Sequence, residues 1–90
     1  MDLPEIRLKI DVVDEQIIRL LNERSDLVHE VGVVKKAQGL ALHVPEREEQ
    51  VLRALAAKAR EMNSRLPEKS IRAIYREIMF AALELEKMSG

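Results

Sequence analysis

Aliphatic side chains recur at alternating steps of four and three residues along the first third of the chain. With one charged member, the series comprises Ile6, Ile10, Val13, Ile17, Leu20, Arg24, Leu27, Val31 and Val34. This spacing places the side chains on one face of a helix. Between Glu5 and Gln38 only Gly32 weakens a helix-favouring composition. The pattern therefore predicts one long helix over this stretch, ending near Gly39.

Two proline-led segments follow the long helix. Pro45 suits the first turn of a helix, because its ring presets the backbone and no N–H is needed there. Two glutamates follow it, at the helix end where negative charge is favourable, and predict a second helix from Pro45 to about Met62. Pro67 with Glu68 repeats the start signal for a third helix, which continues to about Lys87. No window alternates apolar and polar residues at strand spacing, so the predicted fold class is all-α.

The length of the first helix indicates that the protein assembles from more than one copy of the chain. At ~1.5 Å per residue, its 34 residues make a rod of about 50 Å, whereas a compact chain of 90 residues has a diameter of roughly 30 Å. Ile18, Leu21 and Val28 widen the apolar stripe, and two shorter helices cannot cover all of it. Each large aliphatic left in water costs roughly 1.5 to 3 kcal/mol. We therefore expect an intertwined homodimer, with the long helices paired and the shorter ones wrapped around them.

Charged residues stand on the apolar faces of all three predicted helices. Arg24 interrupts the stripe of the long helix, and Lys35 returns to nearly the same face. Glu48 opens the apolar stripe of the second helix, which continues through Val51, Leu52, Leu55, Ala59 and Met62. Glu86 follows the inward row of the third helix, which comprises Ile71, Ile74, Ile78, Ala82 and Leu85. Because an unpaired buried guanidinium is strongly destabilising, Arg24 must meet a protein carboxylate or an anionic ligand.

Cations outnumber carboxylates among these charged residues and their neighbours. Arg47 beside Glu48, and Arg7 near the start of the long helix, bring the cations to four against two carboxylates. Arg7 lies about 25 Å along the helix from Arg24, so one protomer cannot bring both to the same small molecule, whereas in an antiparallel dimer the Arg7 end of one helix can approach the middle of the other. This arrangement predicts an apolar pocket, shared between protomers and suited to a small polyanion. A structural dimer in which Arg24 only sets the register is an alternative that the pattern leaves open.

Composition narrows the chemistry further. The chain has no cysteine, which excludes disulfides and thiolate metal sites. Its net charge of −1 and its two aromatic residues argue against nucleic acid as a partner, and no apolar run is long enough for a membrane span. We expect the serines to lack a histidine partner, His29 to lie on a helix flank, and His43 to lie in a loop, with no metal site. A cytoplasmic protein that works by electrostatic stabilisation and conformational restraint is therefore expected.

Four segments together resemble a known family. They are IRLKID with Arg7, LLNERSDLVHEVGVVK with Arg24 and Lys35, VPERE with Arg47 and Glu48, and IYREIMFAALELE with Ala82 and Glu86. From Leu3 to Glu86 the chain is similar to the all-helical (AroQ) class of chorismate mutase, and most of all to mutase domains fused to the N-terminus of prephenate dehydratase. The resemblance implies a single mutase domain over residues 1–90, built of three helices and interlaced as a homodimer with shared active sites. It also implies an isomerase of the shikimate pathway that rearranges chorismate to prephenate, for phenylalanine and tyrosine biosynthesis, without a cofactor.

The resemblance also implies roles for individual residues. Arg24, together with Arg7 of the second protomer, would grip the two carboxylates of the substrate. Lys35 would contact a carboxylate and the ether oxygen of the breaking C–O bond, and Glu86 would face that oxygen from the opposite side. Arg24, Lys35 and Glu86 are therefore the expected catalytic residues.

Arg47 and Glu48 are expected to complete the substrate site. Arg47 would support it, and Glu48 would accept a hydrogen bond from the ring hydroxyl. Val44 and Ala82 stand where many family members carry Asp and Ser, so a contact from residue 44 would come through the backbone. Glu86 stands where many carry Gln. Because a carboxylate repels the ether oxygen and a carboxylic acid donates to it, we expect activity to be lost as Glu86 deprotonates.

Two further interpretations compete with the enzyme. One is a non-catalytic helical dimerisation module. The other is a regulatory domain that binds chorismate or prephenate and controls an attached enzyme. Turnover of chorismate by the chain, with and without Arg24, separates all three.

Overall fold

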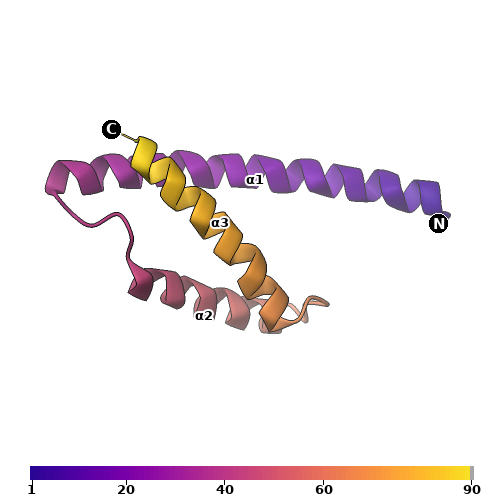
Figure 1. The fold of residues 1–90 in the computed structure, drawn as a ribbon. Coiled ribbons are helices and arrows are strands. Elements are labelled where there is room, and N and C mark those ends of the chain that lie inside the picture. Colours follow the sequence, from indigo (N-terminus) through magenta and orange to yellow (C-terminus); the bar gives the residue numbers. More distant parts are fainter. Residues whose placement is uncertain (90) are drawn as a thin grey trace.

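Three helices make up the protein in a computed structural model that describes residues 1–89, so that Gly90 lies outside the described residues. They are α1 (Leu3–Gln38), α2 (Pro45–Glu61) and α3 (Glu68–Met88). The prediction of an all-α fold with a long N-terminal helix is confirmed (Figure 1). Within residues 1–89, no helix has the length and apolar character that a membrane crossing requires.

Local signals at both ends explain the extent of α1. The Asp2 side chain accepts a hydrogen bond from the Glu5 N–H at 3.0 Å and caps the first turn. The helix therefore begins two residues before the predicted start at Glu5. It ends where Gly39 adopts a left-handed conformation, with φ 68°. The predicted end of the helix is confirmed.

The two shorter helices also lie close to their predicted bounds. α2 begins at Pro45 as predicted and ends at Glu61, one residue before Met62. α3 begins at Glu68 and ends at Met88, one residue beyond the predicted Lys87. Helix ends fray, so differences of one residue leave the placement of the site unchanged.

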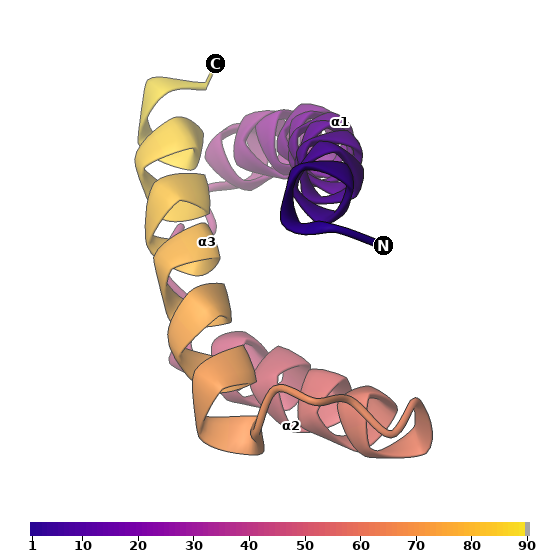
Figure 2. The same ribbon diagram turned by 90° about the vertical axis from the view of Figure 1, so that its right-hand side faces the viewer.

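The helix α3 joins the other two. It packs against α1 near its own C-terminus and against α2 near its N-terminus, whereas α1 and α2 make no direct packing contact within residues 1–89. Figure 2 shows α3 running between the two, with α1 nearly end-on. Residues of α1 and α2 therefore meet only around the C-terminal part of α3 and the loop from residue 39 to 44.

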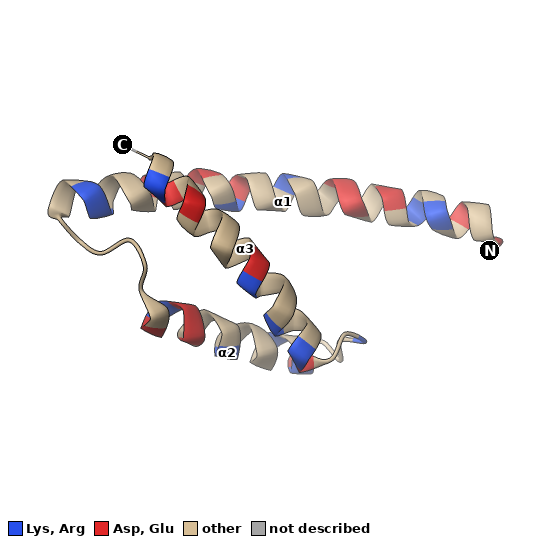
Figure 3. Ribbon diagram, in the orientation of Figure 1, with Lys and Arg blue, Asp and Glu red and all other residues tan. Residues whose placement is uncertain are grey.

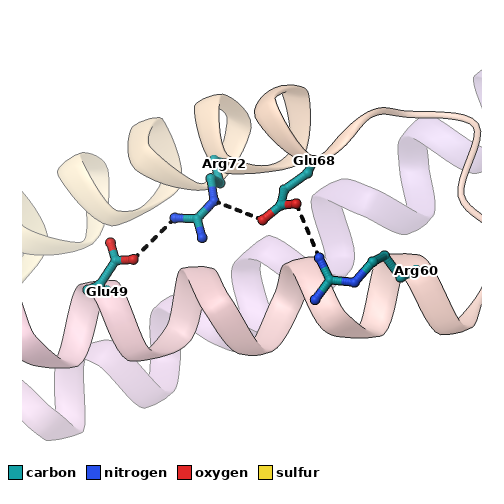
Figure 4. A network of polar contacts seen from close by, with 4 residues as sticks. All are labelled: Glu49, Arg60, Glu68 and Arg72. Atoms are coloured by element: carbon teal, nitrogen blue, oxygen red, sulfur yellow. Dashed lines mark hydrogen bonds and ion pairs between the residues drawn. The ribbon is translucent and has the colours of Figure 1, made fainter.

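A chain of ion pairs ties the N-terminal turn of α3 to α2 (Figure 4). Arg72 donates to Glu49 at 3.3 Å and to Glu68 at 3.4 Å, and Glu68 also accepts from Arg60 at 3.1 Å. Most of these side chains are exposed, so each pair stabilises the fold only slightly. Together they hold the first turns of α3 against α2.

The core of the single chain is small. Among the described residues, its buried apolar residues are Leu52 and Ala56 of α2 and Met79 of α3. Of these, the predicted inward stripes included only Leu52. The predicted inward position of Met62 is wrong, because this residue lies just beyond α2 and is 75% exposed. Ile74 is likewise 47% exposed rather than buried.

Most of the apolar stripe of α1 has no cover from its own chain. The N-terminal half of α1 extends well past α2 and α3 (Figure 1). Most of the large aliphatics along α1 are 39% to 66% exposed: Leu3, Ile6, Leu8, Ile10, Val12, Val13, Ile17, Ile18, Leu20, Leu27, Val31, Val33 and Val34. The prediction that two short helices cannot cover this stripe is confirmed.

Candidate active site

A cavity of about 270 Å³ lies where the C-terminal part of α3 crosses α1 and the loop after α1 turns back toward α2. All but one of the predicted site residues line it: Arg24 and Lys35 from α1, Arg47 and Glu48 from α2, and Ala82 and Glu86 from α3. Apolar side chains such as Val28, Val31 and Leu83 form much of the remaining wall. The fold therefore brings together charges from all three helices around an apolar space.

Lys35 and Glu86 form the enclosed end of the cavity. Lys35 Nζ lies 2.8 Å from Glu86 Oε1, and the two side chains are 20% and 10% exposed. Lys35 Nζ also donates to the backbone carbonyl of Leu42 at 2.7 Å. An ammonium group has three N–H donors, so one donor stays available to a ligand.

Arg24 is half-buried and also lines the cavity. Within residues 1–89 its guanidinium makes no hydrogen bond or ion pair with another side chain, unlike Lys35. Arg47 is exposed at the mouth of the cavity, and its Nη1 donates to Gln50 Oε1 at 2.7 Å. The guanidinium of Arg24 thus has donors in a fork that matches a carboxylate.

Glu48 is paired with a residue that the sequence did not connect to it. His43 Nε2 lies 3.0 Å from Glu48 Oε1, and both residues line the cavity. The predicted place of His43 in a loop is confirmed. One carboxylate oxygen of Glu48 is engaged by His43, and the other is available to a donor in the cavity.

Two contributions of the loop were therefore missed by sequence reasoning. The Leu42 carbonyl carries no sequence signal, because any residue has one. His43 precedes Glu48 by five residues, and this closeness is the only signal that could have linked them. Val44 also lines the cavity and is half-buried.

Arg7 is the predicted site residue that lies elsewhere. It is exposed on the projecting end of α1 and does not line the cavity. Figure 3 shows basic residues near both ends of α1, far from each other along the rod. A single chain therefore does not bring Arg7 and Arg24 to one small molecule.

His29 also has a partner that was not predicted. Its Nδ1 lies 2.9 Å from the Ser89 hydroxyl oxygen, so the expectation that every serine lacks a histidine partner is wrong. Ser89 is 1% exposed and does not line the cavity. A hydroxyl enclosed in this way cannot reach a substrate, and this pair holds α3 against α1.

The charges around the cavity favour a small dianion. Three cations, Arg24, Lys35 and Arg47, face two carboxylates, Glu48 and Glu86. Arg24 can bind a carboxylate with two parallel hydrogen bonds, and the Lys35–Glu86 pair can donate to an oxygen at the enclosed end. The cavity is near the small end of the ordinary range for ligand sites, about 300 to 1,000 Å³. It is suited to holding a small polar metabolite in one conformation.

Comparisons with known proteins agree with this chemistry. A family model described as chorismate mutase type II matches residues 6–87. The bifunctional chorismate mutase/prephenate dehydratase of Aquifex aeolicus is 41% identical over 87 residues, which cover 96% of this chain and 24% of that protein. The chorismate mutase of Methanocaldococcus jannaschii is 36% identical over 61 residues, covering 68% of this chain and 62% of that protein. The chain thus spans about a quarter of the bifunctional relative.

A solved structure shares the whole fold. Form II of the chorismate mutase from Thermus thermophilus superposes with a TM-score of 0.89 at 36% sequence identity. The match covers 94% of this chain and 93% of that one. The helical arrangement around the cavity is therefore similar to that of the Thermus thermophilus chorismate mutase.

Proposed function

The chain belongs to the chorismate mutase type II family, and from this premise we propose that it rearranges chorismate to prephenate, for phenylalanine and tyrosine biosynthesis. The observation that carries the proposal is the meeting of Arg24, Lys35 and Glu86 around one apolar cavity. In this reaction one C–O bond breaks and one C–C bond forms within the same molecule. No proton, electron or group is exchanged with the protein, so positioning and electrostatics are the contributions required.

Arg24 supplies the first contribution, which is orientation. Its free donors bind one substrate carboxylate, and the remaining N–H of Lys35 reaches a second anionic group or the ether oxygen. Fixing the charged ends holds the enolpyruvyl arm over the ring, in the geometry that the bond-forming step needs. Such restraint lowers the activation barrier, because the entropy cost of orienting the reacting groups is met when the substrate binds.

Lys35 and Glu86 supply the second contribution, which is stabilisation of charge. Negative charge grows on the ether oxygen as the C–O bond lengthens. Donors fixed beside that oxygen stabilise the transition state more than the ground state. A protonated Glu86 and the Lys35 ammonium are such donors, and the short contact between them places both beside one point of the cavity.

Glu48, Arg47 and Ala82 complete the proposed site. Glu48 accepts a hydrogen bond from the ring hydroxyl through the oxygen that His43 does not engage. Arg47 adds positive charge at the mouth, and the small side chain of Ala82 forms apolar wall. Together they fix which face of the ring meets the cations.

We propose that the active unit is a homodimer in which a second copy supplies Arg7. The exposed stripe of α1 supports this, because a second α1 has the same length and the same apolar face. In an antiparallel pair, the Arg7 end of one rod approaches the Arg24 region of the other. The missing contact to the second carboxylate is thereby provided.

The proposed domain extends over residues 1–90. The names of the bifunctional relatives support the further proposal that this domain acts beside a prephenate dehydratase. Chorismate turnover by the 90-residue chain tests the mutase activity separately from any such partner.

The test of the proposed function is the substitution Arg24→Leu. We expect chorismate turnover, followed as loss of its absorbance, to fall at least about 10²-fold, because the group that orients a substrate carboxylate is lost. The variant should stay folded, since an apolar residue replaces an unpaired charge. Arg53→Leu is the matched control, because Arg53 is exposed on α2 and lies outside the cavity. Equal turnover by the two variants would refute the proposal.

A further inference from the structure

The end of α3 is held against α1 at a place where α1 has no side chain. Gly32 is the buried residue of α1 among those described. A Cβ built there would lie 2.9 Å from Ser89 Cβ, 3.1 Å from Glu86 Cα and 3.2 Å from the Glu86 carbonyl oxygen. The two Glu86 atoms are backbone and cannot rotate away. Any side chain at position 32 therefore pushes the Glu86 backbone away from α1.

Two residues that flank Gly32 on α1, Lys36 and His29, form hydrogen bonds with the C-terminal end of α3. Lys36 Nζ donates to the Lys87 carbonyl at 2.8 Å and to the Ser89 carbonyl. Carbonyls at a helix C-terminus lack intrahelical partners, and a cation there also complements the helix dipole. His29 Nδ1 meets the Ser89 hydroxyl at 2.9 Å.

The hydrogen bonds of Ser89 show which group is the donor in its contact with His29. The Ser89 hydroxyl donates to the Leu85 carbonyl at 2.9 Å. A hydroxyl has one hydrogen, so with that hydrogen on Leu85 the Nδ1–H of His29 is the donor to Ser89. His29, Gly32 and Lys36 are spaced by three and four residues and lie on one face of α1.

We propose that His29, Gly32 and Lys36 are positioning residues, here called the α3 clamp, that set the distance between Lys35 and Glu86. The proposal rests on the proposed function of that pair. Lys35 follows Gly32 by three residues on a neighbouring part of the helix surface. The separation of the α1 and α3 backbones at Gly32 therefore sets the distance between the side chains of Lys35 and Glu86. No clamp residue lines the cavity. Their effect on catalysis therefore passes through Glu86.

The first test is Gly32→Ala, assayed for chorismate turnover in the 90-residue chain. A displacement of a few tenths of an ångström should lower kcat about tenfold, with KM changed less than about threefold, because Arg24 is undisturbed. Thermal unfolding should show a folded variant, since alanine favours the helix more than glycine does. A folded variant with parental kcat would overturn the proposal.

A second substitution removes the clamp without adding bulk. Lys36→Met loses the bonds to the end of α3 and is expected to lower kcat about threefold, whereas Lys36→Arg should keep most of the activity. Lys58→Met is the matched control, because Lys58 is exposed on α2 and outside the cavity. Equal kcat in the Met and Arg variants of Lys36 would contradict the clamp.

A readout without chorismate separates the clamp from the proposed function. The carbon-13 chemical shift of the Glu86 side-chain carboxyl, measured at one pH, should change in Gly32→Ala and Lys36→Met and stay constant in Lys58→Met. If the parent chain has no turnover but these shifts occur, the mutase proposal fails and the clamp stands. If the Glu86 signal is unchanged in both clamp variants, the clamp is overturned whatever the activity.

Discussion

At the residue scale, the enclosed charges of the site are paired, and the cation without a partner lies at the cavity. Lys35 and Glu86 are the most enclosed, and they pair with each other and with the Leu42 carbonyl, which offsets their desolvation. Arg24 has no such partner within residues 1–89, and it lies at a cavity that water or a carboxylate can enter. The unpaired cation and the paired one therefore have different proposed roles, the first in binding and the second in charge stabilisation.

The substitution Glu86→Gln tests whether position 86 must donate a hydrogen bond. The contact at 2.8 Å is an ion pair when the carboxyl is ionised, and in that form Glu86 cannot donate to an ether oxygen. The amide of glutamine always carries N–H donors. We therefore expect the Gln variant to keep or exceed the kcat of the parent for chorismate turnover. A fall of about 10²-fold or more would show that the carboxyl group itself is required.

At the element scale, the end of α1 builds the loop that holds Lys35. Gly39 turns the backbone into the left-handed region, and the Leu40 N–H then donates to the Lys35 carbonyl at 2.8 Å. The same loop returns the Leu42 carbonyl to Lys35 Nζ. Both the backbone and the side chain of Lys35 are therefore anchored by the short loop that follows Gln38.

The substitution Gly39→Ala should destabilise the protein through its backbone alone. A Cβ at this position meets nothing within 4 Å, so the cost is conformational. We expect a loss of about 1 kcal/mol in the free energy of unfolding, measured with urea. Gly39→Asn should lose less, because asparagine tolerates this conformation better. If Ala and Asn destabilise equally, the left-handed turn is not the cause.

At the scale of the whole molecule, the chain is more extended than a compact fold of its length. Its radius of gyration is 16.0 Å, whereas about 12 Å is typical of a compact chain of this length. The excess comes from the projecting half of α1, where aliphatic side chains are exposed in a continuous row. A second copy that covers this row would at the same time bring Arg7 toward the cavity.

Mixing two inactive variants tests this shared site. Arg7→Ala and Arg24→Leu should each have little turnover alone. When they are unfolded together and refolded, about half of the dimers combine one of each, and one of their two sites receives both native arginines. About a quarter of parental turnover should return. A site built within one protomer would give no recovery, and this result would reject the shared site.

Local signals along the chain were enough to predict the helices and the charges that interrupt their apolar faces. Helix ends depend on nearby residues such as Asp2, Gly39 and Pro45, and apolar periodicity depends on spacing alone, so both can be predicted locally. The tertiary structure decided which of these charges meet. Lys35 and Glu86 are 51 residues apart, and their contact depends on how closely α3 crosses α1 at Gly32. The partners of His29 and His43 were missed for the same physical reason: hydrogen bonds act over about 3 Å, and only the packed chain decides which groups come that close.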